Sequence, residues 1–198
     1  MNSERGVIGR TWFFLRKPNA KYSVLAIGIL SFVLGILLWG GFNTAVEASN
    51  NLDFCISCHE MRDNVYQEYK KTIHYSNPMG VRAICTDCHV PREWSHKILR
   101  KILSTRELWG KVTGVIDTTD KFESHRMELA TRVWERMKAS DSRECRNCHS
   151  FEAIRGSKER QLVFNIHMKA KDKGKTCIDC HKGIAHLLPR EYMDPDEE

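Results

Sequence analysis

Four copies of the motif Cys-x-x-Cys-His constrain this chain more than any other feature of its sequence. Together they use all eight cysteines. At this spacing two thiols form thioethers to the vinyl groups of one haem, and the adjacent histidine reaches its iron. The pattern therefore predicts four covalently attached haems. The predicted attachment residues are Cys55, Cys58, Cys85, Cys88, Cys145, Cys148, Cys177 and Cys180.

Other uses of the thiols explain less of the pattern. A disulfide framework does not require a histidine directly after every second cysteine. Two all-thiolate zinc sites would leave the motif histidines unexplained. Thioredoxin-like chemistry needs one reactive pair in a βαβ unit, and the sequence has no such unit.

An apolar segment precedes the motifs. Residues 22–42 carry no charge, and this length spans a bilayer core. Residues 45–49 match a signal-peptide cleavage site poorly, so we expect an uncleaved anchor, with a cleaved leader as the alternative. Basic residues dominate 1–21, and the positive-inside rule places that stub in the cytoplasm. Residues 43–198 are then a periplasmic domain on the bacterial inner membrane.

The formal net charge of +6 does not indicate nucleic-acid binding. Haem propionates would pair with many of the lysines and arginines. The apolar content outside the anchor is too small for a conventional core, so haem faces must replace core side chains. We expect that the chain does not fold without haem.

The haem region contains a rough duplication, because the motifs form two pairs of similar spacing. A lone histidine lies within each pair, and another follows it. These four histidines are His74, His96, His167 and His186. We therefore expect two di-haem modules separated by an insert.

The insert has helical periodicity, with one helix expected over 94–111 and another over 118–139. No strand pattern of useful length occurs in the sequence. The predicted fold class is mainly α with extensive loops, in which one transmembrane helix precedes a compact tetrahaem domain.

A low-spin haem needs a second axial ligand besides the motif histidine. The motif histidines are His59, His89, His149 and His181. His74, His167 and His186 recur in the duplication and are the favoured second ligands, ahead of His96 and His125. Met61 follows the first motif closely, and spacing alone leaves it open whether Met61 is a ligand or a packing residue.

Several segments resemble the NapC/NirT family of membrane-anchored tetrahaem cytochromes, which oxidise quinols. They are CISCHEMRDNVYQEYKKTIHYSNP (55–78), GVIDTTDKFESHR (114–126), SRECRNCH (142–149) and TCIDCHKGIAH (176–186). The similarity is strongest to the branch that serves periplasmic nitrate reductase. One departure is Arg92, where several relatives have a histidine after Val-Pro; His96 is the nearest substitute.

The resemblance implies a ligand set. Met61 would bind the first haem iron, with His59 not acting as a normal ligand. The implied pairs for the second, third and fourth haems are His89 with His186, His149 with His167, and His181 with His74.

The resemblance also implies a quinol site on the helix expected over 94–111. Glu107 would accept a proton, and Lys101 or Arg100 would hold the quinol. Periodicity puts Lys97, Arg100 and Glu107 on one face, and apolar residues on another. Such a basic amphipathic helix would lie against lipid headgroups, or carry a solvated polar face over a packed apolar stripe.

The expected activity is that of a quinol dehydrogenase with four haem c groups and menaquinol or ubiquinol as substrate. Its expected partner is a periplasmic di-haem cytochrome subunit of nitrate reductase, with nitrite reductase or another reductase as the alternative. A terminal reductase acting at an open haem is a rival of a different class. The short stub leaves little room for a sensor output, and homodimerisation is left open.

Overall fold

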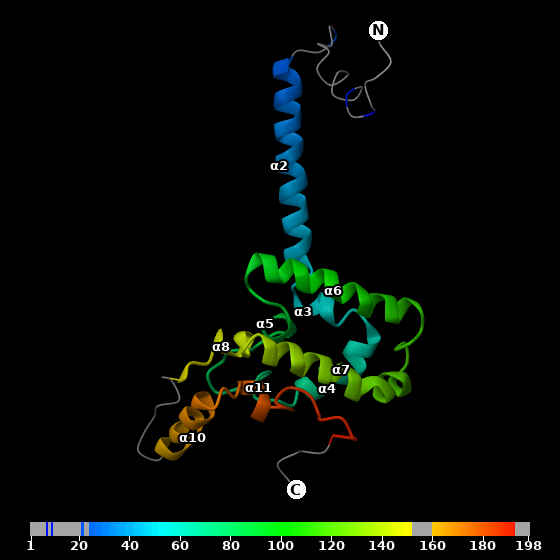
Figure 1. The fold of residues 1–198 in the computed structure, drawn as a ribbon. Helices are drawn as coiled ribbons and strands as arrows, with labels where there is room; N and C mark the ends of the chain where they lie inside the picture. Colours follow the sequence, from blue (N-terminus) through cyan, green and yellow to red (C-terminus); the bar gives the residue numbers. More distant parts are fainter. Residues whose placement is uncertain (1–6, 8, 10–20, 22–23, 152–159, 193–198) are drawn as a thin grey trace. The chain divides into compact units, whose positions relative to one another are not determined.

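The structure is a computed structural model that describes residues 24–151 and 160–192, together with Val7, Gly9 and Lys21. Almost all of the predicted stub 1–21 lies outside the described residues. The chain forms two compact units, residues 1–46 and 47–198, whose elements are labelled in Figure 1.

The first unit is dominated by α2, which covers Val24–Ala48. Its segment from Leu25 to Ala48 has a mean hydropathy of 2.3 and is long and apolar enough to cross a membrane. The helix covers most of the apolar segment 22–42 and continues through the uncharged residues 43–46 to Glu47 and Ala48. Tyr22 and Ser23 lie outside the described residues.

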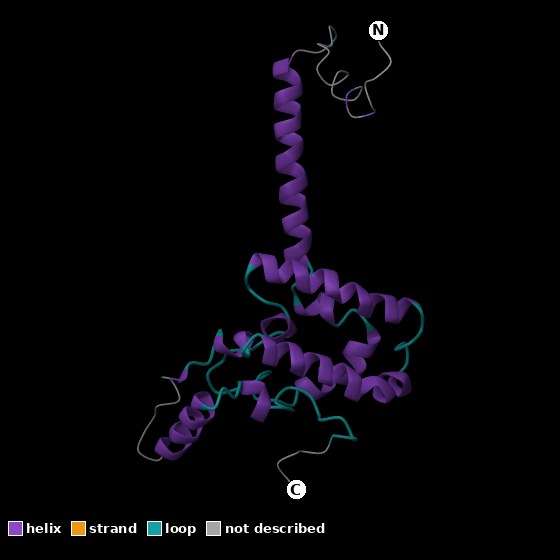
Figure 2. Ribbon diagram, viewed as in Figure 1, coloured by secondary structure: helices purple, strands orange, loops and turns teal. Residues whose placement is uncertain are grey.

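The second unit is built from helices and loops, and the described residues contain no strand (Figure 2). This confirms the predicted fold class, although the division into two di-haem modules stays a prediction. The two longest helices of the unit are α6 (Trp94–Val112) and α7 (Thr119–Ala139). They match the expected helices closely. Thr118 caps α7 by accepting a hydrogen bond of 3.3 Å from the Lys121 amide.

The remaining elements of this unit are short. They are α3 (Leu52–Cys55), a π-helix η1 (Met61–Val65), α4 (Tyr66–Tyr69), α5 (Cys85–His89), α8 (Arg143–Arg146), α10 (Gln161–Asp172) and α11 (Cys177–Cys180). Each Cys-x-x-Cys-His motif overlaps one of these helices, which in chain order are α3, α5, α8 and α11.

The side-chain core of the second unit is thin. Within its described residues the buried apolar side chains are Tyr69, Phe122, Met137 and Ile178. So few cannot supply the apolar burial that a domain of this length needs. This is the situation predicted for a domain whose interior is shared with haem.

Candidate functional site

The cysteine pairs of the second and fourth motifs each lie on a single helical turn. In α5 and α11 the two cysteines are three positions apart, which places both thiols on one side of the turn. Asp87 and Asp179 fix the starts of these turns by accepting hydrogen bonds of 2.8 Å from the amides of Ile84 and Thr176. None of the eight cysteines forms a disulfide, so every pair keeps two thiols for attachment.

The four motifs follow one another through the domain in sequence order. The helix α3 of the first motif packs against α5 of the second. In turn α5 packs against α8 of the third motif. The buried Ser142 then accepts a hydrogen bond of 3.1 Å from the Ile178 amide in the fourth motif. The first, second, third and fourth attachment sites therefore form a continuous row.

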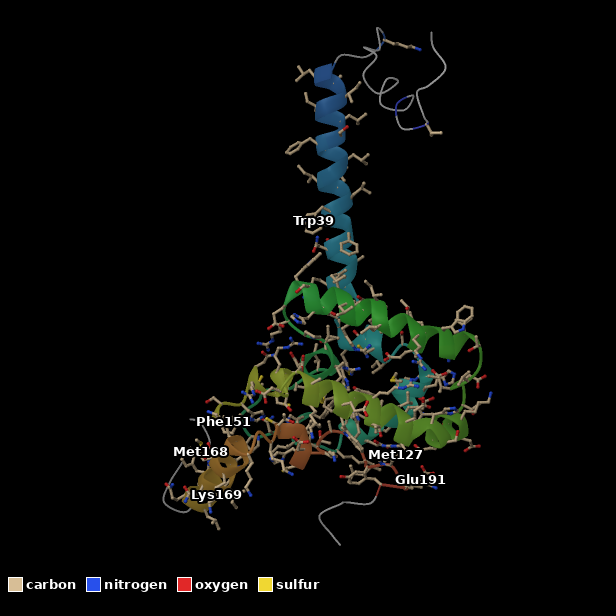
Figure 3. All side chains as sticks on the ribbon, in the orientation of Figure 1. Trp39, Met127, Phe151, Met168, Lys169 and Glu191 are labelled. Atoms are coloured by element: carbon tan, nitrogen blue, oxygen red, sulfur yellow. The ribbon has the colours of Figure 1, made fainter. Side chains whose placement is uncertain are left out.

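Three motif histidines each face a second histidine. The ring centres are 6.1 Å apart for His89 and His186. The other pairs are His74 with His149 at 6.2 Å, and His167 with His181 at 5.9 Å. His167 lies on α10, beside Met168 and Lys169, which are labelled in Figure 3.

This arrangement differs from the ligand pairing that the family resemblance implies. The pair His89 and His186 is as expected. His149 faces His74 rather than His167, and His181 faces His167 rather than His74. The reason is local: α10 lies only a few residues before the fourth motif and brings His167 back to it.

The paired histidines fit a haem iron. Metal–imidazole bonds of about 2 Å on both sides, plus the distance from each nitrogen to its ring centre, require ring centres about 6 Å apart. All three observed separations lie near this value. The Nδ1 atoms of His74 and His186 are buried without a hydrogen-bond partner in the described part of the chain. Burial also lowers the pKa of His89 to about 3, which keeps the ring in the neutral form that metals bind.

The first motif differs from the others. His59 belongs to none of the histidine pairs among the described residues. Its Nε2 lies 3.1 Å from Oε1 of Glu60, which is 2% exposed and also accepts a hydrogen bond from Lys111. Burial alone would raise the pKa of the Glu60 carboxyl, but the hydrogen bond from Lys111 holds this pKa below its ordinary value. Met61 is half-buried at the start of η1.

The predicted quinol residues are grouped along α6. Arg100 donates hydrogen bonds of 2.9 and 3.3 Å to the Glu107 carboxylate. Lys101 donates one of 2.6 Å to Ser49, and it lies near enough to Cys55 for their charges to interact. Burial lowers the pKa of Lys101. Of these groups, Lys101 lies beside the first attachment site, whereas Arg100 is close enough to His89 of the second motif for their charges to interact.

The orientation of α6 contradicts the interpretation of a solvated polar face over a packed apolar stripe. The side chains of Lys97 and Arg100 are 14% and 12% exposed. Ile102 and Trp109 are 60% and 68% exposed. The basic face points into the domain because buried and neighbouring acids pair with it, so the apolar face is the outer one.

Two other predicted candidates stay apart from the pairs. His96 is exposed on α6. Nδ1 of His125 lies 2.9 Å from the carbonyl oxygen of Lys121, within the same helix. Neither imidazole is among the ring contacts of the described residues.

Sequence reasoning missed the buried charges that organise the site. Glu60 meets Lys111, and Arg126 meets Glu68, across 51 and 58 positions of the chain. These residues carry no motif and no periodicity that separates them from the many exposed charges. Only the Glu60 position, inside the first Cys-x-x-Cys-His-x-Met segment, offered a signal.

Comparison with known proteins gives a consistent result. The model of the NapC/NirT cytochrome c family, N-terminal region, matches residues 17–191. The chain is 57% identical over 184 residues to the denitrification system component NirT of Stutzerimonas stutzeri, covering 93% of this chain and 92% of the relative. It is 52% identical over 193 residues to the cytochrome c-type protein NapC of Escherichia coli K12, covering 95% and 94%.

A third relative is the putative tetraheme cytochrome-c type protein of Allochromatium vinosum. It is 45% identical over 174 residues, covering 88% of this chain and 94% of the relative. No solved structure matches the chain.

Proposed function

The chain belongs to the NapC/NirT cytochrome c family, and we propose that it takes electrons from membrane quinol and passes them through four covalent haems to a periplasmic reductase. Membership of a cytochrome c family means that haem is attached through the cysteine pairs. When bound, each haem supplies a one-electron redox centre, so a row of four provides a path.

The observation that carries this proposal is the difference between the first motif and the other three. The second, third and fourth motifs each have a paired histidine, whereas His59 is engaged with Glu60. The first motif also comes directly after the apolar helix in the sequence. We therefore assign the first haem as the place where electrons enter, with Met61 in place of His59 as its axial ligand.

The axial ligands of the other haems are proposed from the observed pairs. His89 and His186 would hold the second haem iron, and His149 and His74 the third. His181 and His167 would hold the fourth. Two nitrogen ligands on each iron favour the low-spin state that suits electron transfer over substrate binding.

The quinol site is assigned to α6 beside the first motif. Quinol oxidation releases protons, so an acceptor must lie close to the haem that takes the electrons. Glu107 is that acceptor in our proposal, because its carboxylate is half-exposed and within reach of solvent. Arg100 holds the carboxylate in place through two hydrogen bonds. Lys101 then contacts the quinol oxygen next to Cys55.

The partner proposal rests on the family resemblance. The likeness to the branch that serves periplasmic nitrate reductase favours a nitrate reductase with a di-haem cytochrome subunit as electron acceptor. A nitrite reductase is the alternative, and NirT, at 57% identity, is named as a denitrification component. In both cases the α2 helix anchors the chain in the inner membrane with the haem domain in the periplasm.

Reconstitution tests the donor side of the proposal. The full-length holoprotein is placed in vesicles with a menaquinol or ubiquinol analogue, and haem reduction is followed by absorption. Rapid reduction by at least one quinol is expected. If neither quinol reduces haem that dithionite reduces fully, the quinol dehydrogenase assignment is wrong.

A further inference from the structure

The outer face of α6 is apolar over most of its length. Leu103 and Val112 are 57% and 77% exposed, and Leu99, Ile102 and Trp109 are exposed with them. An apolar face of this kind is unfavourable in water unless something covers it. Arg106 is exposed within the same outer surface, and its long stem can keep the charge in water while its methylenes stay apolar.

The inner face of α6 is held by polar contacts to the start of the domain. Lys97 forms an ion pair of 2.5 Å with Glu47, and Lys101 donates a hydrogen bond to Ser49. Lys111 reaches the buried Glu60. These contacts prevent the helix from rotating its apolar face inward, since that would leave the buried Glu60 carboxylate without Lys111.

The residues that hold α6 indicate what covers its outer face. Glu47 is the first charged residue after the apolar segment, and Ser49 follows two positions later. Both belong to the same unit as α6, so α6 lies beside the residues that directly follow the apolar segment. Where that segment spans a bilayer, the apolar medium next to these residues is lipid, and Trp109 is a side chain that suits the interface.

We propose that the outer face of α6, formed by Leu99, Ile102, Leu103, Trp109 and Val112, inserts into the interface of the same bilayer that α2 spans. The helix is then a second, monotopic membrane contact. This proposal rests on the anchoring by α2 in the proposed function. It places the Arg100 and Glu107 pair at the boundary where a lipid-soluble quinol arrives.

Photo-crosslinking from single positions tests this contact. p-Benzoylphenylalanine replaces Ile102 in the full-length holoprotein, which is reconstituted in vesicles of phosphatidylethanolamine and phosphatidylglycerol. Leu34 in α2 is the lipid-contacting control. Leu162 in α10 is the matched exposed apolar control, at 70% exposure. Haem absorption confirms that each variant is folded.

The expected result is lipid adducts from positions 34 and 102, identified by mass, and none from position 162. Adducts from 34 alone would overturn the α6 proposal and leave the anchoring intact. A crosslink from 102 to a second copy of the chain would also overturn it, because the face would then be a dimer interface. Absence of adducts from 34 would reject the anchoring itself.

Discussion

Arg126 donates hydrogen bonds of 2.8 and 2.6 Å to the two carboxylate oxygens of Glu68, although the residues are 58 positions apart. Leu187 joins this pair from the C-terminal segment. Its amide donates to Glu68 at 2.9 Å, and its carbonyl accepts from Arg126 at 2.8 Å. The pair therefore holds the segment directly after His186, the residue that faces His89.

Breaking the pair between Glu68 and Arg126 should destabilise the domain and disturb one haem. In Glu68→Gln the largely buried Arg126 guanidinium keeps only the Glu123 carboxylate, so we expect a cost below the about 3–5 kcal/mol of a fully broken buried pair. The displaced His186 would also leave one iron with a single protein ligand. We expect a lower thermal midpoint and a high-spin signal in the oxidised spectrum.

The control for this variant is Glu128→Gln, which breaks the exposed pair between Glu128 and Arg132. Exposed pairs contribute about 0–1 kcal/mol, so its thermal midpoint should stay near wild type. Equal shifts of the thermal midpoint in the two variants would contradict a structural role for the pair of Glu68 and Arg126.

The Glu68 carboxylate also predicts that the stability of the domain depends on pH. Burial alone would raise the pKa of Glu68, but hydrogen bonds from Arg126 and Leu187 hold this pKa below its ordinary value. A lowered folded-state pKa gives stabilisation that is present above the unfolded pKa, about 4.3, and is lost as pH falls through the folded value. The difference in thermal midpoint between wild type and Glu68→Gln should therefore shrink below about pH 4. A difference that is constant down to pH 3 would count against this account.

The ligand pairing proposed from the facing histidines gives a spectroscopic prediction. His74→Ala should produce one high-spin haem, because His149 loses its facing imidazole. Adding Cys145→Ser and Cys148→Ser removes the third haem and should remove the high-spin signal with it. Electron paramagnetic resonance of the oxidised holoprotein measures this.

The matched control removes the fourth haem instead, through Cys177→Ser and Cys180→Ser. The high-spin signal of His74→Ala should then persist. A high-spin signal that persists without the third haem and disappears without the fourth would contradict this pairing. It would support the pairing of His74 with His181 that the family resemblance implies.

Much of the architecture could be predicted from sequence, because short-range patterns encode it. The spacing of cysteines, the uncharged segment before Glu47 and the helical periodicity of 94–111 are all local signals. The facing of His74 and His149 depends on how loops return through the domain, and no local pattern carries that information.

The orientation of α6 could not be predicted for a related reason. Periodicity separates a basic face from an apolar face but does not say which one points inward. The answer depends on distant acids such as Glu47 and Glu60, which draw Lys97 and Lys111 inward. In a membrane-anchored chain lipid can replace the core as the apolar medium, so the apolar face of a helix can point outward.

The quinol site predicts a specific loss of activity. In Glu107→Gln the proton acceptor is absent, while Arg100 can still bond the amide oxygen. We expect the rate of haem reduction by quinol in vesicles to fall about a hundredfold, with unchanged haem spectra and unchanged reduction by dithionite. Glu135→Gln, an exposed acid on α7, should keep the wild-type rate. An unchanged rate in Glu107→Gln would remove Glu107 from the mechanism.

The central claim is that electrons enter at the first motif, and selective removal of its haem tests it most directly. Full-length Cys55→Ser with Cys58→Ser is compared in vesicles with Cys177→Ser and Cys180→Ser, which lacks the fourth haem. Both retain three haems that dithionite reduces. The account predicts that quinol reduces the remaining haems only in the variant that keeps the first motif. Quinol reduction at the wild-type rate without the first haem would contradict it.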